Sequence, residues 1–285
     1  MMVLFGPGGN SISFREEGHK STLDAPKWLY ERGLNAYEYE CGQGVRISEE
    51  TAIKFGEEAK KYGITLSVHA PYFISLSSVE EEKRDNSIKY ILDTLKVAKL
   101  MGARRIVVHP GSCSKRDRNE AFELALLTMK KAVEEAKANG YGDVEICPET
   151  MGKINQLGSV EEIAKMCKID DMLVPTVDFG HINAREMGSL KTEEDFEKIV
   201  KCFINELGEE RGRRFHVHFS KIEYTSGGEK RHLTFADNVY GPEFLPLARI
   251  IKKYNLDLTI ICESDGTMAE DALAMKKILD EVEAE

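Results

Sequence analysis

The sequence of 285 residues lacks several features that would place it in a specialised class of protein. No apolar run approaches the roughly 20 residues that a membrane span needs. The first residues have neither a basic segment nor a long apolar one, so we expect no signal peptide. No two of the six cysteines form a CxxC pair, which suits buried thiols in a reducing cytosol better than a disulfide framework. We therefore expect a cytoplasmic protein that does not associate with membranes.

The sequence also has fewer basic residues than acidic residues. There are 39 Lys and Arg residues against 49 Asp and Glu, which gives a formal net charge of −10. This argues weakly against a general nucleic-acid binder, although a local basic rim is compatible with a negative total. No linker rich in Pro, Gly or Ser divides the chain, so we expect one domain over residues 1–285 and, in solution, a monomer.

Short apolar runs alternate with longer amphipathic segments from end to end, and each kind has its own periodicity. The strands are expected at 2–6, 35–41, 65–70, 105–110, 144–149, 173–178, 214–220 and 258–263. The helices are expected at 22–33, 48–63, 80–103, 115–140, 159–168, 192–208, 242–255 and 267–284. Eight β-α units in a chain of this length predict an α/β fold, a (β/α)8 TIM barrel, with a doubly wound open sheet as the alternative.

Six of the predicted strands end in a residue that can bind a metal: His69, His109, Glu149, Asp178, His218 and Glu263. In a barrel of parallel strands the carboxyl ends meet at one face, where active sites lie. An open sheet would instead place its site at one switch point. Three imidazoles and three carboxylates exceed what one tetrahedral zinc takes, so the pattern predicts a multinuclear site at the carboxyl ends of the strands.

The remaining histidines carry less information. His181 lies three residues after Asp178 on a turning loop, from which the two side chains can reach neighbouring metals, and His232 lies in the long loop after the seventh strand. His216 shares a strand face with His218 but lies deeper, so it either supports the site or competes for the ligand role. The glycine-rich segment 6–11 lacks the Gly-Lys-Ser/Thr ending of a phosphate loop, so we expect no nucleotide cofactor.

The strand-end residues lie within longer motifs, which follow in this order along the chain: Val68-His69-Ala70-Pro71-Tyr72, Val108-His109-Pro110-Gly111-Ser112, Cys147-Pro148-Glu149-Thr150, Asp178-Phe179-Gly180-His181, His218-Phe219-Ser220 and the strand end at Glu263. In content and order these motifs resemble those of the endonuclease IV family of zinc-dependent apurinic/apyrimidinic endonucleases, within the xylose-isomerase-like TIM barrels. The resemblance covers nearly the whole chain.

The resemblance implies a set of metal ligands. His69, His109 and Glu149 correspond to the ligands of a first zinc, and Glu149 would bridge to a second zinc held with Asp178, His218 and Glu263. His181 and His232 correspond to ligands of a third zinc. The family adds an aspartate two residues before the second of these histidines, where this chain has Lys230, with Glu229 one residue earlier. Either Glu229 or water would then complete the third site. Manganese and iron are alternatives for the same ligands.

The resemblance also implies DNA with abasic sites as the partner, cut on the 5′ side of the lesion. Glu149, Glu263 and Asp178 would be the catalytic residues. Tyr72 and Phe73 are placed to stack on a base, and Arg46, Lys115, Lys230 and Arg231 follow strands on the active face, where they could contact phosphates, as could Arg116, Arg118 and Lys221. However, the loop after the second strand is short and has one positive charge. A metal-dependent sugar isomerase or epimerase on the same barrel is therefore the alternative, and a barrel that binds without turnover is a third possibility.

Overall fold

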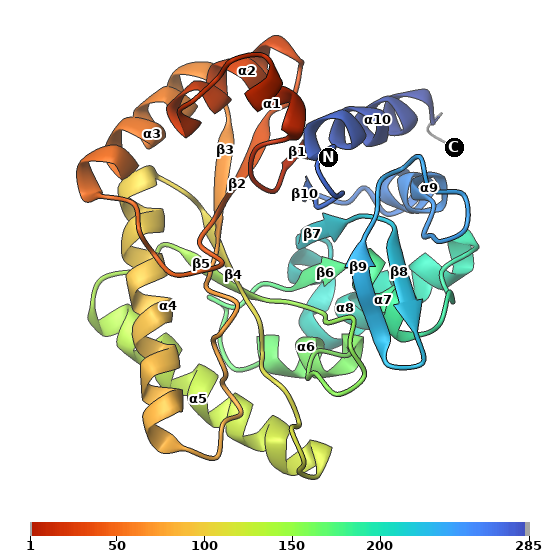
Figure 1. The fold of residues 1–285 in the computed structure, drawn as a ribbon. Coiled ribbons are helices and arrows are strands. Elements are labelled where there is room, and N and C mark those ends of the chain that lie inside the picture. Colours follow the sequence, from red (N-terminus) through yellow and green to blue (C-terminus); the bar gives the residue numbers. More distant parts are fainter. Residues whose placement is uncertain (1, 283–285) are drawn as a thin grey trace.

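The computed structural model describes residues 2–282, which form a barrel of parallel strands surrounded by helices (Figure 1). The barrel strands are β1 (Val3–Pro7), β2 (Ala36–Glu40), β3 (Thr65–His69), β4 (Arg105–Val108), β5 (Glu145–Pro148), β6 (Thr176–Asp178), β7 (His216–Phe219) and β10 (Leu258–Cys262). They form two four-stranded sheets in the orders β2-β3-β4-β5 and β1-β10-β7-β6. Parallel bridges join the sheets between Gly8 and Glu38 and between Glu149 and Thr176. The predicted TIM barrel is confirmed.

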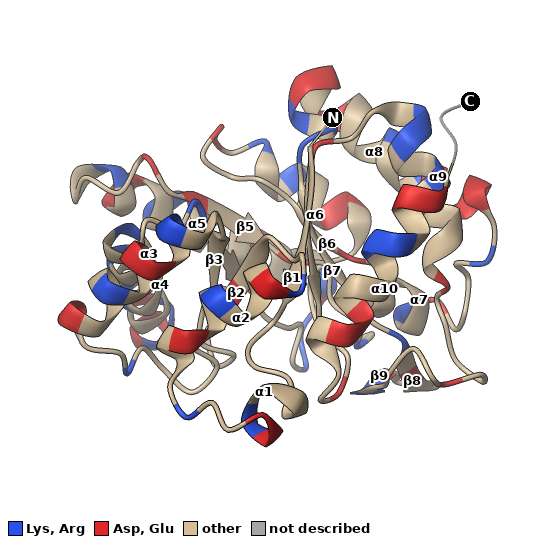
Figure 2. Ribbon diagram, turned by 90° about the horizontal axis from the view of Figure 1, so that it is seen from above, with Lys and Arg blue, Asp and Glu red and all other residues tan. Residues whose placement is uncertain are grey.

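The helices lie outside the strands, as the amphipathic segments predicted. They are α1 (Ile12–Glu16), the 3-10 turn η1 (Thr22–Asp24), α2 (Ala25–Glu31), α3 (Glu49–Tyr62), α4 (Glu81–Met101), α5 (Arg118–Ala138), α6 (Val160–Cys167), α7 (Phe179–Arg185), α8 (Glu193–Gly212), α9 (Phe244–Tyr254) and α10 (Met268–Glu281). Acidic and basic residues are interspersed over these outer helices (Figure 2). None of the helices within residues 2–282 is long and apolar enough to cross a membrane.

Local sequence signals account for several helix ends. Ser48 caps α3 through a hydrogen bond to the Thr51 amide, and Ser159 forms the predicted capping box with Glu162. Gly63 ends α3 in the left-handed conformation that glycine adopts without a steric cost. The expected end of a helix at Gly208 was wrong, because the chain kinks there and continues helically to Gly212.

Three further elements differ from expectation. Of the predicted strand 173–178, only Thr176–Asp178 forms a continuous strand, although Leu173 makes a parallel bridge with Ile146 of β5. The turning loop expected after Asp178 is the short helix α7, which Asp178 caps through the His181 amide. The long loop after β7 contains an antiparallel hairpin, β8 (Ile222–Thr225) and β9 (Gly228–His232). Residues 283 and 284 of the helix predicted over 267–284 lie outside the described residues.

Candidate metal centre

The polar residues at the strand ends meet in one cavity of about 800 Å³ at the carboxyl face of the barrel. Its lining includes His69, His109, Glu149, His181, His232 and Glu263. Asp178 and His218 lie beneath this layer and are fully buried. The structure thus brings together every residue for which the sequence predicted a metal-binding role.

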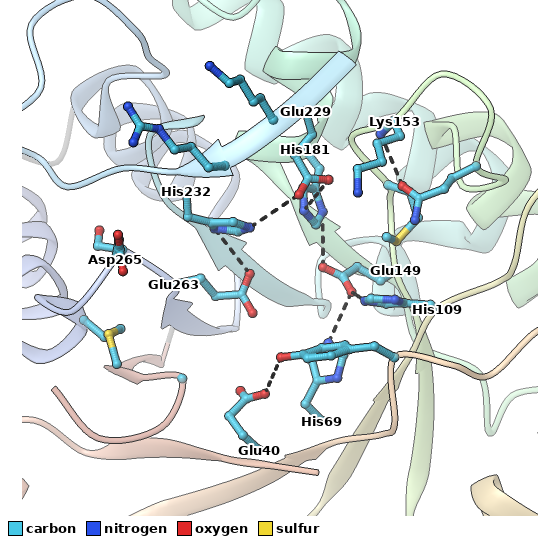
Figure 3. Close-up of a pocket in the computed structure, with 18 of the residues that line it drawn as sticks. Glu40, His69, His109, Glu149, Lys153, His181, Glu229, His232, Glu263 and Asp265 are labelled. Atoms are coloured by element: carbon cyan, nitrogen blue, oxygen red, sulfur yellow. Dashed lines mark hydrogen bonds and ion pairs between the residues drawn. The ribbon is translucent and has the colours of Figure 1, made fainter. Parts of the chain in front are cut away.

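Glu149 lies at the centre of the group (Figure 3). Its Oε2 lies 3.0 Å from Nε2 of His109 and 3.5 Å from Nε2 of His69. Its Oε1 lies 3.0 Å from Nδ1 of His218 and 3.4 Å from Nδ1 of His181. The carboxylate that follows β5 therefore contacts four histidines, which belong to four different segments of the chain.

Three groups of donor atoms include the residues that the sequence predicted as ligands, and within each group the atoms lie within 4.8 Å of one another; the first two groups share Glu149. The groups are His69, His109 and Glu149; Glu149, Asp178, His218 and Glu263; and His181, Glu229 and His232. Imidazole nitrogen and carboxylate oxygen are the ligands preferred by zinc and similar divalent metals.

Backbone and hydroxyl partners orient three of the imidazoles. Nδ1 of His69 lies 2.8 Å from the Ala70 carbonyl oxygen, which can only accept, so Nδ1 carries the proton and Nε2 is free to bind a metal. Nδ1 of His181 lies 3.0 Å from the Thr150 carbonyl oxygen, and Nδ1 of His232 lies 2.9 Å from Oγ of Ser220. In all three residues the Nε2 atom faces a carboxylate of the cavity.

The hairpin β8–β9 decides which residue faces His181 and His232. Oε2 of Glu229 lies 3.5 Å from Nε2 of His181, and its Oε1 lies 3.9 Å from Nε2 of His232. The ladder pairs Glu223 with Arg231 and then Tyr224 with Glu229, so that Lys230 is the extra residue of a β-bulge. Because the bulge shifts the alternation of side chains by one position, Glu229 shares the face of His232.

A close approach of two loops completes this arrangement. The Glu229 amide donates a hydrogen bond of 3.0 Å to the Gly152 carbonyl oxygen. A Cβ atom at Gly152 would lie 2.6 Å from Cβ of Glu229 and 3.0 Å from Cδ2 of His181. Only glycine at position 152 therefore allows the hairpin to bring Glu229 against His181. The Lys230 ammonium instead pairs with Glu223 at 2.6 Å.

The charges of the centre also fit a bound cation. Burial alone would raise the pKa of Glu149, but His218, His109 and His181 hold it well below its usual range. Burial raises the pKa of Glu263 to about 8. Oε2 of Glu149 and Oδ2 of Asp178 are buried, and although imidazole nitrogens lie 3.0 and 3.2 Å away, no contact to either oxygen among the described residues has hydrogen-bond geometry. Buried carboxylate oxygens without a donor are costly unless a cation binds them, so this donor set fits divalent metals.

Tyr72 forms one wall of the cavity rather than projecting freely. Its ring stacks on His109 with centroids 5.5 Å apart, and its hydroxyl donates a hydrogen bond of 3.0 Å to Oε2 of Glu40. The residue is nevertheless 54% exposed, so part of its side chain remains accessible from the cavity. Phe73 is exposed to a similar extent, but its ring packs edge-on against Tyr90 and does not line the cavity.

The predicted phosphate-binding residues separate into two groups. Lys230 and Arg231 line the cavity, although both pair with Glu223 at 2.6 Å, while Arg46 and Lys115 are exposed outside it. Lys221 is not at the rim, since it is 4% exposed and bound to Glu243. Arg116 and Arg118 likewise donate to backbone carbonyl groups and, for Arg118, to Glu162. These three side chains thus have partners within the protein, and contact with phosphates by Arg116, Arg118 or Lys221 stays a prediction.

Two glutamates of β2 were overlooked in the sequence. Glu40 lines the cavity beside His69 (Figure 3). Glu38 is fully buried and does not line the cavity. They are two positions apart and so share one face of the strand. A pair of carboxylates with this spacing in an otherwise buried strand was the signal that could have identified them.

Comparison with known proteins places the chain in a family. Residues 26–280 match the family model described as xylose isomerase-like TIM barrel. The chain belongs to the xylose isomerase-like TIM barrel family. An uncharacterised protein of Methanocaldococcus jannaschii is 34% identical over 97% of both chains. A probable endonuclease 4 of Staphylococcus carnosus is 28% identical over 61% of this chain and 59% of its own length, which confirms the resemblance to endonuclease IV.

Solved structures of two kinds share this family's fold. Endonuclease IV of Thermus thermophilus superposes with a TM-score of 0.70 and 19% identity, covering 98% of this chain and all of its own. A D-tagatose 3-epimerase-like protein also gives a TM-score of 0.70, with 23% identity, covering 99% of this chain and 96% of its own. At these identities the two structures establish the fold alone.

Proposed function

We propose that this protein is a metal-dependent phosphodiester hydrolase of the endonuclease IV type, which cuts DNA on the 5′ side of abasic sites in base excision repair. The observation that carries the proposal is the third donor group, formed by His181, Glu229 and His232. A sugar epimerase of this fold requires one metal, for which the group around Glu149 and Asp178 would suffice. A third group of donors is better explained by a polynuclear site for a phosphodiester.

The proposed ligands divide among two or three zinc ions. His69, His109 and Glu149 would hold the first, and Glu149 would share the second with Asp178, His218 and Glu263. The third would be held by His181, Glu229 and His232. Metal ions bound here would supply positive charge for the phosphate oxygens and acidify a water molecule.

The protein's own groups would then orient the reactants. Asp178 and Glu149 are almost fully buried, so they anchor the site. The Glu263 side chain is 17% exposed and faces the cavity, which suits it to orient the attacking water and accept its proton. The accessible part of the Tyr72 side chain would contact the extruded abasic nucleotide, whose unstacking costs least because its base is missing.

A sugar epimerase or isomerase is the second candidate, and Glu40 is the observation in its favour. This carboxylate lines the cavity, where it would repel a phosphate but could accept hydrogen bonds from sugar hydroxyls. The net charge of −10 and the short loop after β2 also do not favour DNA. The two functions differ in the number of metals needed and in the sign of charge tolerated in the cavity.

The test uses a zinc-loaded protein and a duplex with one synthetic abasic site, with and without a chelator. We expect a cut just 5′ of the lesion with a 3′-hydroxyl end, lost on chelation and reduced in Glu263→Gln. The same preparation would be incubated with ketoses, and epimers separated by chromatography. Epimerisation without DNA cleavage, by protein that holds metal, would replace the hydrolase proposal with the second candidate.

A further inference from the structure

The strongest additional feature is Glu38, which lies directly below the candidate metal centre. Its Oε2 accepts a hydrogen bond of 2.6 Å from Oγ of Ser67 and lies 3.0 Å from Nε2 of His216. Its Oε1 lies 2.7 Å from Nε2 of His218. All of these groups are buried, and the side chains of Glu38, His216 and His218 are fully so. One carboxylate of β2 thus joins two histidines of β7 across the interior of the barrel.

The two nitrogens of His218 face different carboxylates. Nδ1 lies 3.0 Å from Oε1 of Glu149 and 3.4 Å from Oε1 of Glu263, on the side of the metal centre. Nε2 faces Glu38, on the side away from the cavity. A histidine that binds a metal through one nitrogen commonly has the other held by a carboxylate, which fixes the ring and its tautomer. The two sides of His218 match this arrangement in residue type and distance, although the 2.7 Å contact between Nε2 and Glu38 does not have ideal hydrogen-bond geometry in this structure.

The complete burial of the Glu38 carboxylate needs a physical explanation. A fully buried charge is costly unless it is paired and hydrogen-bonded, and an apolar residue in a barrel interior avoids that cost. Glu40 shows that the same face of β2 can present a carboxylate to the cavity, but Glu38 does not line it. The position of Glu38 therefore suits support of His218 better than contact with substrate.

We propose that Glu38 is a positioning residue, which holds His218 with Nδ1 directed at the metal shared by Glu149, Asp178 and Glu263. The inference rests on the metal centre of the proposed function but not on its substrate. His216 is the second partner of Glu38 and, in this arrangement, supports the carboxylate rather than competing with His218 as a ligand.

The test compares metal binding in the wild type and in Glu38→Gln. Glutamine keeps the size of the side chain and its carbonyl oxygen can accept a hydrogen bond from Ser67, but its amide nitrogen cannot accept a hydrogen bond from Nε2 of His218. We expect the saturated variant to bind the wild-type number of zinc ions, with a dissociation constant raised about 10- to 100-fold in chelator competition. Val174→Ala is the matched control, since Val174 is buried in the barrel against Val107 and Cys147 and should lose stability without losing zinc affinity.

Several outcomes would overturn the proposal. Unchanged zinc affinity in Glu38→Gln would show that Glu38 does not position His218. An equal loss of zinc affinity in a Val174→Ala variant of the same stability would show the same. Loss of one zinc equivalent at saturation would make Glu38 a ligand itself. If Glu38→Gln does not fold, Ser67→Ala takes its place, and affinity weakened less than about twofold would count against the role. A wild-type protein that binds no divalent metal would overturn the proposed function as well.

Discussion

Oε2 of Glu229 lies 3.5 Å from Nε2 of His181, although one residue belongs to the hairpin after β7 and the other to the helix after β6. The contact depends on a bulge at Lys230, which places Glu229 on the same face as His232. The family resemblance implies an acidic ligand two positions before His232, where this chain has Lys230. In the structure Glu229, three positions before His232, provides that carboxylate. The third donor group is complete because of a local irregularity in the strand.

Substitutions at the bulge test whether Glu229 or Lys230 completes the third donor group. We expect Glu229→Gln to lower the zinc content at saturation by one equivalent, because a neutral amide is a poor third ligand beside two imidazoles. Lys230→Gln should keep all equivalents, since the Lys230 ammonium pairs with Glu223. Elemental analysis after dialysis against a weak chelator provides the count. Equal zinc contents in the two variants would contradict this assignment.

Deletion of Lys230 tests the bulge itself. In a regular strand, residues two positions apart share a face, so removing the extra residue would leave Glu229 two positions before His232 and on its side. We expect the deletion variant to retain the third zinc equivalent. Inserting an alanine after Lys230 should remove it, because Glu229 then points away. Loss of zinc in the deletion variant but not in the insertion variant would contradict this account.

Glu149 should be the least replaceable ligand, since it contacts His69, His109, His181 and His218. We expect Glu149→Gln to lose two zinc equivalents and to reduce turnover about 10³-fold or more, because two metals lose a shared ligand. Metal analysis and steady-state kinetics on the abasic duplex measure the two effects. Glu145→Gln is a control, since Glu145 pairs with Arg105 and Arg214 at the opposite end of β5. A zinc content that falls equally in both variants would point to general unfolding.

Tyr72 offers a test of how the cavity contacts its substrate. Tyr72→Phe loses the hydrogen bond to Glu40 but keeps the ring stacked on His109, whereas Tyr72→Ala loses both. We expect Tyr72→Ala to raise KM about 10-fold or more, because stacking of a base next to the lesion on an aromatic ring contributes about 1–3 kcal/mol. Tyr72→Phe should change KM about threefold or less. Similar KM values for both variants would restrict Tyr72 to a structural role.

The metal-free protein should lose stability as the pH rises from 6.5 to 8. Burial opposes protonation of His69, but Glu149 and Glu40 outweigh it and raise its pKa to about 10, while burial raises the pKa of Glu263 to about 8. In the folded state both groups hold a proton over most of this range, whereas in the unfolded state the Glu263 carboxyl is already ionised and the His69 imidazole loses its proton at about pH 6.5. The free energy of unfolding should therefore fall by about 1–2 kcal/mol per pH unit. Urea denaturation at several pH values measures it, and constant or rising stability would contradict the expectation.

The pattern of the sequence was sufficient for the barrel and for most of the metal centre. Apolar runs of strand length alternate with amphipathic segments, and burial of the apolar faces leaves few other arrangements. The carboxyl ends of parallel strands then meet at one face, so that His69, His109, Glu149 and Glu263 converge whatever the loops do. Motif spacing, which depends on this geometry, correctly indicated the endonuclease IV resemblance.

Only the tertiary structure decided the positions of Glu229 and Glu38. Glu229 reaches His181 because a bulge shifts the strand by one residue and because Gly152 leaves room for it, and neither condition follows from local propensity. Glu38 was unremarkable in sequence because its partners, His216 and His218, are distant in the chain. Strand periodicity determines the face on which a side chain lies, whereas its partner depends on register and on contacts between elements that fold together.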